Sequence, residues 1–204
     1  ELPEVETIRR GITPRLEGQL IQTVIVRESR LRWPVPDNLA TILPHQQVQS
    51  IQRRGKYLLF RCSQGHILIH LGMSGNLRVL PPGTPVKKHD HLDLIFNRQV
   101  CLRYHDPRRF GSVLWTTAPI LTHPLLVDLG LEPLETEFTG NYLYRGAQKR
   151  QVAVKNYIMN SHVVVGVGNI YANEALFLAG IHPARAAGDI SLKRYQNLAK
   201  NIKQ

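Results

Sequence analysis

The spacing of the apolar residues changes along this chain, and that change constrains the fold more than any other feature. In the first 120 residues, apolar and polar residues roughly alternate in short runs rich in Val, Ile, Leu and Tyr, which is typical of half-buried β-strands. Eight runs follow this pattern: 23–27, 47–51, 57–62, 66–71, 76–80, 91–96, 100–104 and 112–116. Turn signals such as Ser63-Gln64-Gly65 separate them. Short, closely spaced strands indicate an antiparallel sandwich or barrel.

Helical spacing occurs on both sides of this β segment. At the N-terminus, apolar residues recur every three or four positions and predict a leading helix: Leu2, Val5, Ile8, Ile12 and Leu16. Beyond about residue 120 the spacing predicts further helices at 123–129, 140–149, 152–159, 169–178 and 191–203. We therefore predict an α+β fold: an eight-stranded antiparallel β-sandwich with a leading helix over residues 1–130, then a helical domain over 131–204. Gly130 and Pro133 mark the linker.

Basic residues are concentrated in both predicted domains. The chain has 204 residues, 26 Lys and Arg against 15 Asp and Glu, and a formal net charge of +11. Residues 1–120 carry 17 basic and 9 acidic side chains, residues 141–204 carry 9 and 2, and residues 121–140 carry four acids and no Lys or Arg. Two basic lobes joined by an acidic connector suit a polyanion held from two sides. The alternative is a soluble protein with solvated basic faces.

The sequence gives little indication of a metal site, a disulfide or a membrane-spanning segment. The two cysteines, Cys62 and Cys101, cannot assemble a Cys-based zinc site, and both lie in strand-like runs, where they behave as buried apolar residues. His89, Asp90 and His91 include metal-ligand types but lack partners at zinc-like spacing, so we predict no metal site. No stretch approaches the ~20 apolar residues that span a bilayer, and no charged leader precedes an apolar segment. We expect a cytoplasmic protein without a membrane partner.

Three loop motifs in the β segment carry side chains that suit contact with nucleic acid. Met73 lies between two glycines in HLGMSG, which predicts a tight exposed turn with Met at its tip, although Met is more often a core residue. In RYHDPRRFG an Asp-Pro turn precedes two arginines and Phe110, where ordinary loop packing is the alternative. Lys56, in RRGKYLL, lies where a basic turn enters a strand, and taken alone it is a surface lysine.

A fourth motif, GVGNIYANEALF, opens a helix in the second domain. Gly166 and Gly168 are not followed by the third glycine of a dinucleotide-binding loop, and no βαβ pattern surrounds them. Instead the segment predicts a glycine turn, Asn169 as the N-cap and a helix from Ile170, as in a helix–turn–helix unit. A helix N-terminus of this kind can hold a phosphate.

Taken together, ELPEVET, RRGKYLL, HLGMSG, KHDH, RYHDPRRFG and GVGNIYANEALF resemble the motifs of bacterial formamidopyrimidine-DNA glycosylases, and the resemblance extends over residues 1–203. It implies that the helical domain is a helix–two-turn–helix domain. It also implies a bifunctional DNA glycosylase and AP lyase of base-excision repair, which removes 8-oxoguanine and formamidopyrimidines through a Schiff base. The implied partner is double-stranded DNA with oxidised bases or abasic sites, bound by a monomer associated with the bacterial nucleoid.

The resemblance also assigns residue roles. Glu1 and Lys56 would be catalytic, Glu1 shuttling protons for opening of the sugar ring and Lys56 assisting strand cleavage. The DNA-binding residues would be His89, Arg108, Arg150, Met73, Phe110, Lys155 and Asn169. Within this set, Met73, Arg108 and Phe110 would form a wedge that enters the duplex where the damaged base leaves it. His89, Arg150, Lys155 and Asn169 would contact the DNA backbone.

Two parts of the family pattern fall outside the sequence. The nucleophilic proline of the family would precede Glu1, and its C-terminal zinc finger would follow residue 204. We therefore expect no cofactor within this chain, and one zinc ion if the zinc finger is present in the full protein. Two alternatives stay open: a catalytically inert protein that binds damaged DNA without the proline, and a basic RNA-associated protein. The wedge motif argues against the second.

Overall fold

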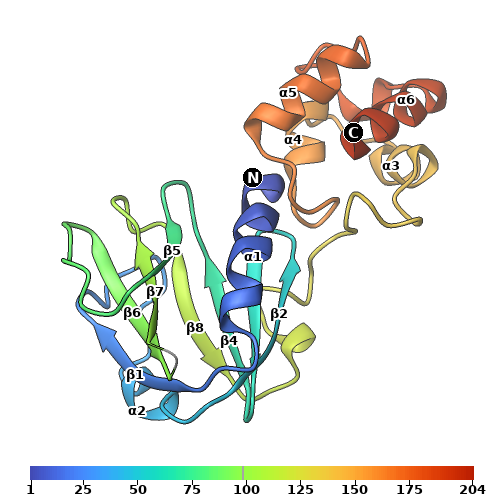
Figure 1. The fold of residues 1–204 in the computed structure, drawn as a ribbon. Coiled ribbons are helices and arrows are strands. Elements are labelled where there is room, and N and C mark those ends of the chain that lie inside the picture. The colour runs from blue at the N-terminus through green and yellow to red at the C-terminus, as the bar shows by residue number, and fades with distance from the viewer. Residues whose placement is uncertain (98) are drawn as a thin grey trace. The chain divides into compact units, whose positions relative to one another are not determined.

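The computed structural model describes residues 1–97 and 99–204, which form two compact units (Figure 1). The first, here called the sandwich unit, is Glu4–His123. The second, called the helical unit, combines Glu1–Pro3 with Pro124–Gln204. The division predicted from the sequence falls after residue 130.

The sandwich unit contains most of the leading helix and two antiparallel sheets of four strands each, as predicted. The helix is α1 (Leu2–Leu16), and the strands are β1 (Ile21–Val26), β2 (Val48–Arg54), β3 (Tyr57–Cys62), β4 (His66–His70), β5 (Asn76–Leu80), β6 (Asp90–Phe96), β7 (Val100–His105) and β8 (Ser112–Thr116). One sheet has the order β1-β6-β7-β5 and the other β2-β3-β4-β8. A short helix, α2 (Leu39–Ile42), follows β1.

Apolar side chains from α1 and from both sheets form one core. Leu16, Phe60, Phe96 and Tyr104 are fully buried within it. Burying side chains of this size removes a large apolar area from water, which is the main stabilising contribution to a sandwich. Cys62 and Cys101 are buried free thiols, as predicted, and burial raises the pKa of Cys62 to about 12.

Strand register brings several loops to one end of the sandwich unit. His70, the last residue of β4, pairs with Ser112, the first residue of β8. His105, the last residue of β7, pairs with the first residues of both β5 and β6, Asn76 and Asp90. The β4–β5 connection, the β7–β8 connection and the approach to β6 therefore lie at the same end. These are the segments that carry the predicted wedge and His89.

The helical unit is built from α3 (Gly140–Ala147), α4 (Val154–Met159), α5 (Asn169–Leu178) and α6 (Leu192–Lys203). Thr139 and Ser191 cap α3 and α6 by accepting hydrogen bonds from backbone amides in the first turn of each helix. Phe138, Leu143 and Tyr195 are fully buried in its own core. A 3₁₀ turn (Ala187–Asp189) precedes α6.

The helix predicted over residues 123–129 is wrong. The chain forms a 3₁₀ turn at Ile120–Thr122 and then a series of turns. Leu129 N donates to Leu126 O three residues back, and Gly130 N donates to the distant Ser161 O. A segment this short gains little from helix formation alone. Burial of Leu126 and the bond to Ser161 determine its path instead.

No helix in residues 1–97 and 99–204 combines the length and the apolar character needed to cross a membrane.

Candidate nucleic-acid interface

The turn that carries Met73 packs directly on the loop that carries Phe110. Gly72 has a φ of 62°, and a Cβ added there would lie 2.6 Å from the carbonyl carbon of Phe110. Only glycine permits both that backbone conformation and this close approach. Met73 is 74% exposed, which confirms the predicted exposed turn.

Arg108 and Phe110 lie together at the same place. The Arg108 Cζ is 4.6 Å from the centroid of the Phe110 ring, which itself is 43% exposed. A cavity of about 760 Å³ opens here, and it is lined by Arg30, Arg32, Met73, Arg108, Arg109 and Phe110. The structure thus brings the three predicted wedge residues together with Arg109 of the same motif, and it adds Arg30 and Arg32, which none of the motifs includes. An apolar surface bordered by guanidinium groups suits a stacked base flanked by phosphates.

Lys56 lies in the turn between β2 and β3, and its charge acts on His70. Burial, together with the positive charges of Lys56 and Arg32, lowers the pKa of His70 to about 4. Gly72 N donates to His70 Nδ1 at 3.0 Å. A neutral His70 therefore carries its proton on Nε2, where it is a hydrogen-bond donor. His70 begins the HLGMSG motif, but the sequence alone predicts no role for it.

His89 lies in the turn before β6 with a φ of 73°. The centroid of its ring is 6.1 Å from that of His91 and 6.2 Å from that of His105. Asp90, buried beneath this turn, accepts a hydrogen bond from Lys87 N and lies 2.8 Å from His105 Nδ1. Among the described residues, no group of three or more His, Cys, Asp or Glu side chains could hold a metal ion.

Glu1 caps α5 of the helical unit. Its Oε1 accepts from Ile170 N at 2.8 Å, and its Oε2 accepts from Tyr171 N at 3.2 Å. A Cβ added at Gly168 would lie 2.5 Å from the Glu1 carboxyl carbon, so the carboxylate needs glycine at that position to reach the helix. A negative charge at a helix N-terminus is stabilised by the helix dipole and by the free amides of the first turn.

The capping role predicted for Asn169 is therefore wrong. Asn169 is the first residue of α5, Gly168 occupies the N-cap position, and no N-cap side chain bonds to the helix. Glycine leaves the first amides open to an acceptor from elsewhere in the chain, and Glu1 supplies it. Asn169 remains exposed at the start of the helix. Lys155 lies in α4 of the same unit and is partly exposed.

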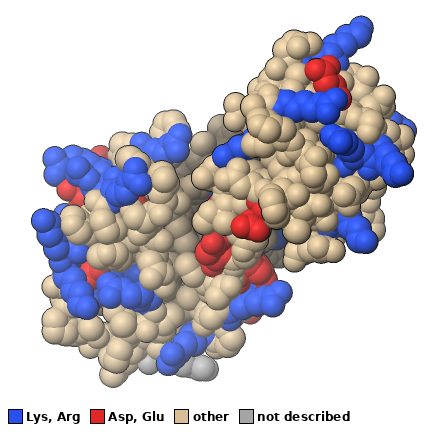
Figure 2. All heavy atoms as spheres, turned by 90° about the horizontal axis from the view of Figure 1, so that it is seen from above, with Lys and Arg blue, Asp and Glu red and all other residues tan. Residues whose placement is uncertain are grey.

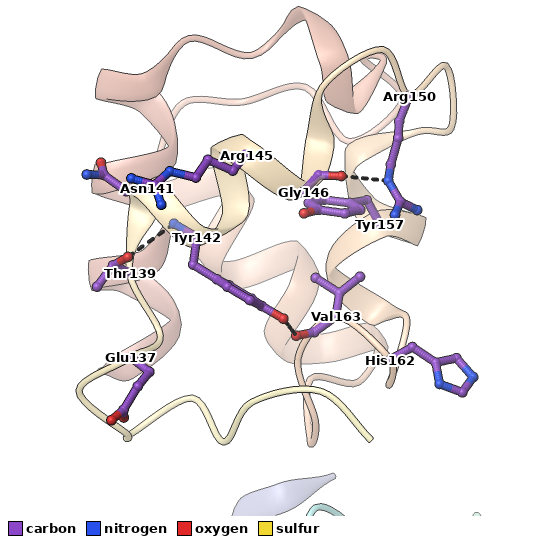
Figure 3. A pocket seen from close by; sticks show the side chains of 10 residues that line it. All are labelled: Glu137, Thr139, Asn141, Tyr142, Arg145, Gly146, Arg150, Tyr157, His162 and Val163. Carbon is purple, nitrogen blue, oxygen red and sulfur yellow. Dashed lines mark hydrogen bonds between the residues drawn. The ribbon is translucent and has the colours of Figure 1, made fainter. Parts of the chain in front are cut away.

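Arg150 borders a polar groove in the helical unit (Figure 3). Its Nε donates to Gly146 O at 2.6 Å, and its guanidinium carbon lies 5.4 Å from the centroid of the Tyr157 ring. Two fixed contacts restrict the side chain before any ligand binds. The groove, about 770 Å³, is lined by Glu137, Thr139, Asn141, Tyr142, Arg145, Gly146, Arg150, Tyr157, His162 and Val163. A guanidinium held in this way is suited to a phosphate oxygen.

Lys and Arg side chains are visible on the surface of each unit (Figure 2). The sandwich unit has basic loops around an exposed aromatic ring, and the helical unit has a restrained arginine. The N-terminus of α5, predicted to hold a phosphate, is occupied instead by the Glu1 carboxylate. Each unit separately offers features typical of surfaces that bind nucleic acid.

Comparison with protein families matches both parts of the chain. Residues 1–113 match the formamidopyrimidine-DNA glycosylase N-terminal domain, and residues 129–204 match the formamidopyrimidine-DNA glycosylase H2TH domain. The chain is 61% identical over 203 residues to the formamidopyrimidine-DNA glycosylase of Nitrosococcus oceani, covering 100% of this chain and 75% of the relative. It is 59% identical over 202 residues to that of Methylococcus capsulatus, covering 99% and 74%.

Solved structures show the same likeness. A complex of Lactococcus lactis Fpg with DNA that contains an abasic site matches with a TM-score of 0.92 at 33% sequence identity, covering 100% of this chain and 75% of the solved one. A complex of the same Lactococcus protein with Fapy-dG-containing DNA matches with a TM-score of 0.93 at 33% identity, covering 100% and 77%.

Proposed function

This chain belongs to the formamidopyrimidine-DNA glycosylase family, and we propose that it excises oxidised purines, namely 8-oxoguanine and formamidopyrimidines, from double-stranded DNA. It is an enzyme of base-excision repair, and the relatives do not favour the alternative of an inert DNA-binding protein. The observation that carries the substrate proposal is the meeting of Met73, Arg108 and Phe110 at one open cavity. Relatives solved with abasic-site DNA and with Fapy-dG-containing DNA support it.

The wedge compensates for the base that leaves the duplex. Extruding a nucleotide leaves a gap in the stack and an unpaired partner base, which together cost a few kcal/mol. Met73 fills the gap, Phe110 stacks on the neighbouring base, and Arg108 donates hydrogen bonds to the exposed edge of the orphaned base. Arg108 already lies against the Phe110 ring, so the two side chains enter as one unit.

Chemistry at the sugar uses an amine and a carboxylate. In the family pattern, the secondary amine of a proline directly before Glu1 attacks C1′, the bond from C1′ to the base breaks, and the base leaves with a proton. The bond between C1′ and the ring oxygen then breaks, and the oxygen takes up a proton as the sugar ring opens. C1′ remains bound to the amine as the Schiff base. Glu1 carries these protons. An α-amino group has a pKa of ~7.7–8.0, so part of it is unprotonated and nucleophilic near neutral pH.

Strand cleavage is the second step of the proposed reaction. Removal of a proton from C2′ of the Schiff base expels the 3′ phosphate by β-elimination, which is the AP-lyase activity. Lys56 assists this proton transfer and pairs with the phosphate. His89, Arg150, Lys155 and Asn169 hold the DNA backbone, with Arg150 restrained in advance by Gly146 and Tyr157.

We also propose that the protein acts as a monomer in the bacterial cytoplasm. The described residues do not fit a zinc site, so no step proposed here depends on zinc, and the zinc ion of the family would need ligands outside them.

Borohydride trapping tests the chemistry directly, because only a Schiff base is reduced to a permanent cross-link. Protein with a proline immediately before Glu1 should be trapped on an abasic-site duplex, whereas a variant whose first residue is Glu1 should not. In the proline-bearing protein, Glu1→Gln should slow excision by roughly 10²–10⁴-fold, the usual value of a general acid or base. Its binding of lesion DNA should stay within a few-fold. Equal trapping with and without the proline would contradict the mechanism.

A further inference from the structure

Asp106 is a fully buried carboxylate that three segments of the sandwich unit share. It is 0% exposed. Its Oδ1 accepts from the Ser74 hydroxyl at 2.7 Å, and its Oδ2 accepts from the Tyr104 hydroxyl and from Gly111 N, both at 2.9 Å. Burial would raise the pKa of Asp106, but these hydrogen bonds outweigh burial and hold the pKa below its usual value. The side chain is therefore an anion at neutral pH.

The backbone of Asp106 adds contacts to the same loops. Its N–H donates to His89 O at 3.0 Å, and its carbonyl accepts from Arg109 N at 3.3 Å. The same carbonyl lies 2.7 Å from His91 Nε2. One residue thus connects the turn that carries His89 with the loop that carries Arg108 and Phe110.

Ser74 connects the third loop. Besides donating to Asp106, its hydroxyl oxygen accepts from Arg108 N at 3.2 Å. Met73 and Arg108 are therefore joined through one hydroxyl group, although 35 positions separate them in the sequence. Without Ser74, the Met73 turn would keep its packing at Gly72 but lose its polar link to the Arg108 loop.

We propose that Asp106 and Ser74 are positioning residues that hold Met73, Arg108, Phe110 and His89 in one fixed arrangement before DNA binds. This inference rests on the proposed function, because it assumes that these side chains enter or grip the duplex. Asp106 is buried and acts through the loops rather than on DNA. Side chains fixed in advance lose less conformational freedom when the base leaves the stack. The effect should therefore appear in base opening rather than in general affinity.

The test compares three serine variants of the full chain, with a fluorescent base analogue placed opposite an 8-oxoguanine in duplex DNA. Ser74→Ala removes the link, and Ser74→Thr retains a hydroxyl. Ser63→Ala is the matched control, because the Ser63 hydroxyl also accepts a backbone hydrogen bond, from Gln47 N, at a different turn. Ser74→Ala should slow base opening about tenfold, the loss expected for about one hydrogen bond. Its affinity for intact duplex should stay within about twofold, and Ser74→Thr should restore opening.

A merely structural role would give another result. Ser74→Ala would then lower the thermal midpoint well beyond the Ser63→Ala control, and opening and intact-duplex affinity would fall together. That outcome, or failure of Ser74→Thr to restore opening, would overturn the inference. Asp106→Asn, which keeps the shape but places an amide opposite hydrogen-bond donors, should slow opening further. If it does not fold, the Ser74 variants alone decide.

Phe110→Ala, measured in the same assay, distinguishes a failure of the positioning role from a failure of the proposed wedge. Slow opening with Phe110→Ala but normal opening with Ser74→Ala would reject the positioning role and leave the proposed function intact. Normal opening with Phe110→Ala would reject the wedge itself.

Discussion

At the residue scale, Glu1 is both the side chain proposed to move protons and the cap of α5. The hydrogen bonds that its carboxylate accepts from the amides of Ile170 and Tyr171 link residues about 170 positions apart. No local pattern indicates such a contact, so the sequence analysis assigned the cap to Asn169. Local reasoning identifies a helix start and its need for an acceptor. It cannot identify an acceptor that arrives from the other end of the chain.

His70 gives a prediction at the same scale. Its pKa is about 4 in the folded protein, because burial first and then Lys56 and Arg32 disfavour its charged form, against 6.5 when unfolded. Between those two values the unfolded chain binds a proton that the folded chain does not. The free energy of unfolding should therefore fall as the pH drops from 6.5 toward 4, by about 1–2 kcal/mol at pH 5.

Urea unfolding at pH 7 and at pH 5 measures this effect. His70→Gln keeps an acceptor for Gly72 N but cannot titrate, so the difference between the two pH values should shrink relative to wild type. Other titrating groups contribute equally to both proteins and cancel. An unchanged difference would mean that His70 titrates normally in the folded state.

At the scale of elements, all eight strands were predictable, because each is a short apolar run bounded by turn signals. Alternation is weaker in β4, β6 and β7, which are buried on both faces. β2 continues to Arg54, three residues beyond the predicted end, because pairing with β3 extends the strand past its apolar residues. The predicted helix at 123–129 failed because tertiary bonds decided the path of a short segment. The wedge residues were assigned from the resemblance of their motifs to the family, whereas Ser74 and Asp106 look like ordinary turn residues until the loops are seen together.

Strands β6 and β7 are joined by a buried ion pair, and its removal should strongly destabilise the fold. Arg103, 3% exposed, donates through Nε and Nη2 to both carboxylate oxygens of Asp93 at 2.8 and 3.0 Å. It also donates to the carbonyls of Thr84 and Pro85. Arg103→Met removes the donor to Asp93 Oδ1 and to both carbonyls, leaving Asp93 only the Arg27 guanidinium at 2.6 Å, and should lower the free energy of unfolding by about 3–5 kcal/mol.

Arg30→Met is the matched control for that prediction. The Arg30 guanidinium pairs with Glu28 at the surface and its side chain is 79% exposed, so solvent screens the pair and the free energy of unfolding should barely change. Denaturant unfolding of both variants makes the comparison. An equally small loss in both variants would show that the buried pair of Arg103 contributes no more than a surface pair.

At the scale of the whole molecule, the two units divide the proposed work. The sandwich unit carries the wedge and the loops fixed by Asp106. The helical unit carries Glu1, the N-terminus of α5 and the restrained Arg150. The charge pattern predicted two basic lobes, and the surface of each unit carries Lys and Arg. Recognition of the opened nucleotide should depend on the first unit, and sequence-independent affinity on phosphate contacts of the second.

The most direct test of this division is the opening of lesion-containing DNA by Phe110→Ala and Arg150→Ala, followed with a fluorescent base opposite the lesion. Phe110→Ala should lose stacking worth roughly 1–3 kcal/mol, so opening and the preference for lesion over intact duplex should fall while affinity for intact duplex is retained. Arg150→Ala should weaken binding to all duplexes alike and reduce the salt dependence by about one unit. Unchanged opening with Phe110→Ala, together with lost lesion preference in Arg150→Ala, would contradict the account.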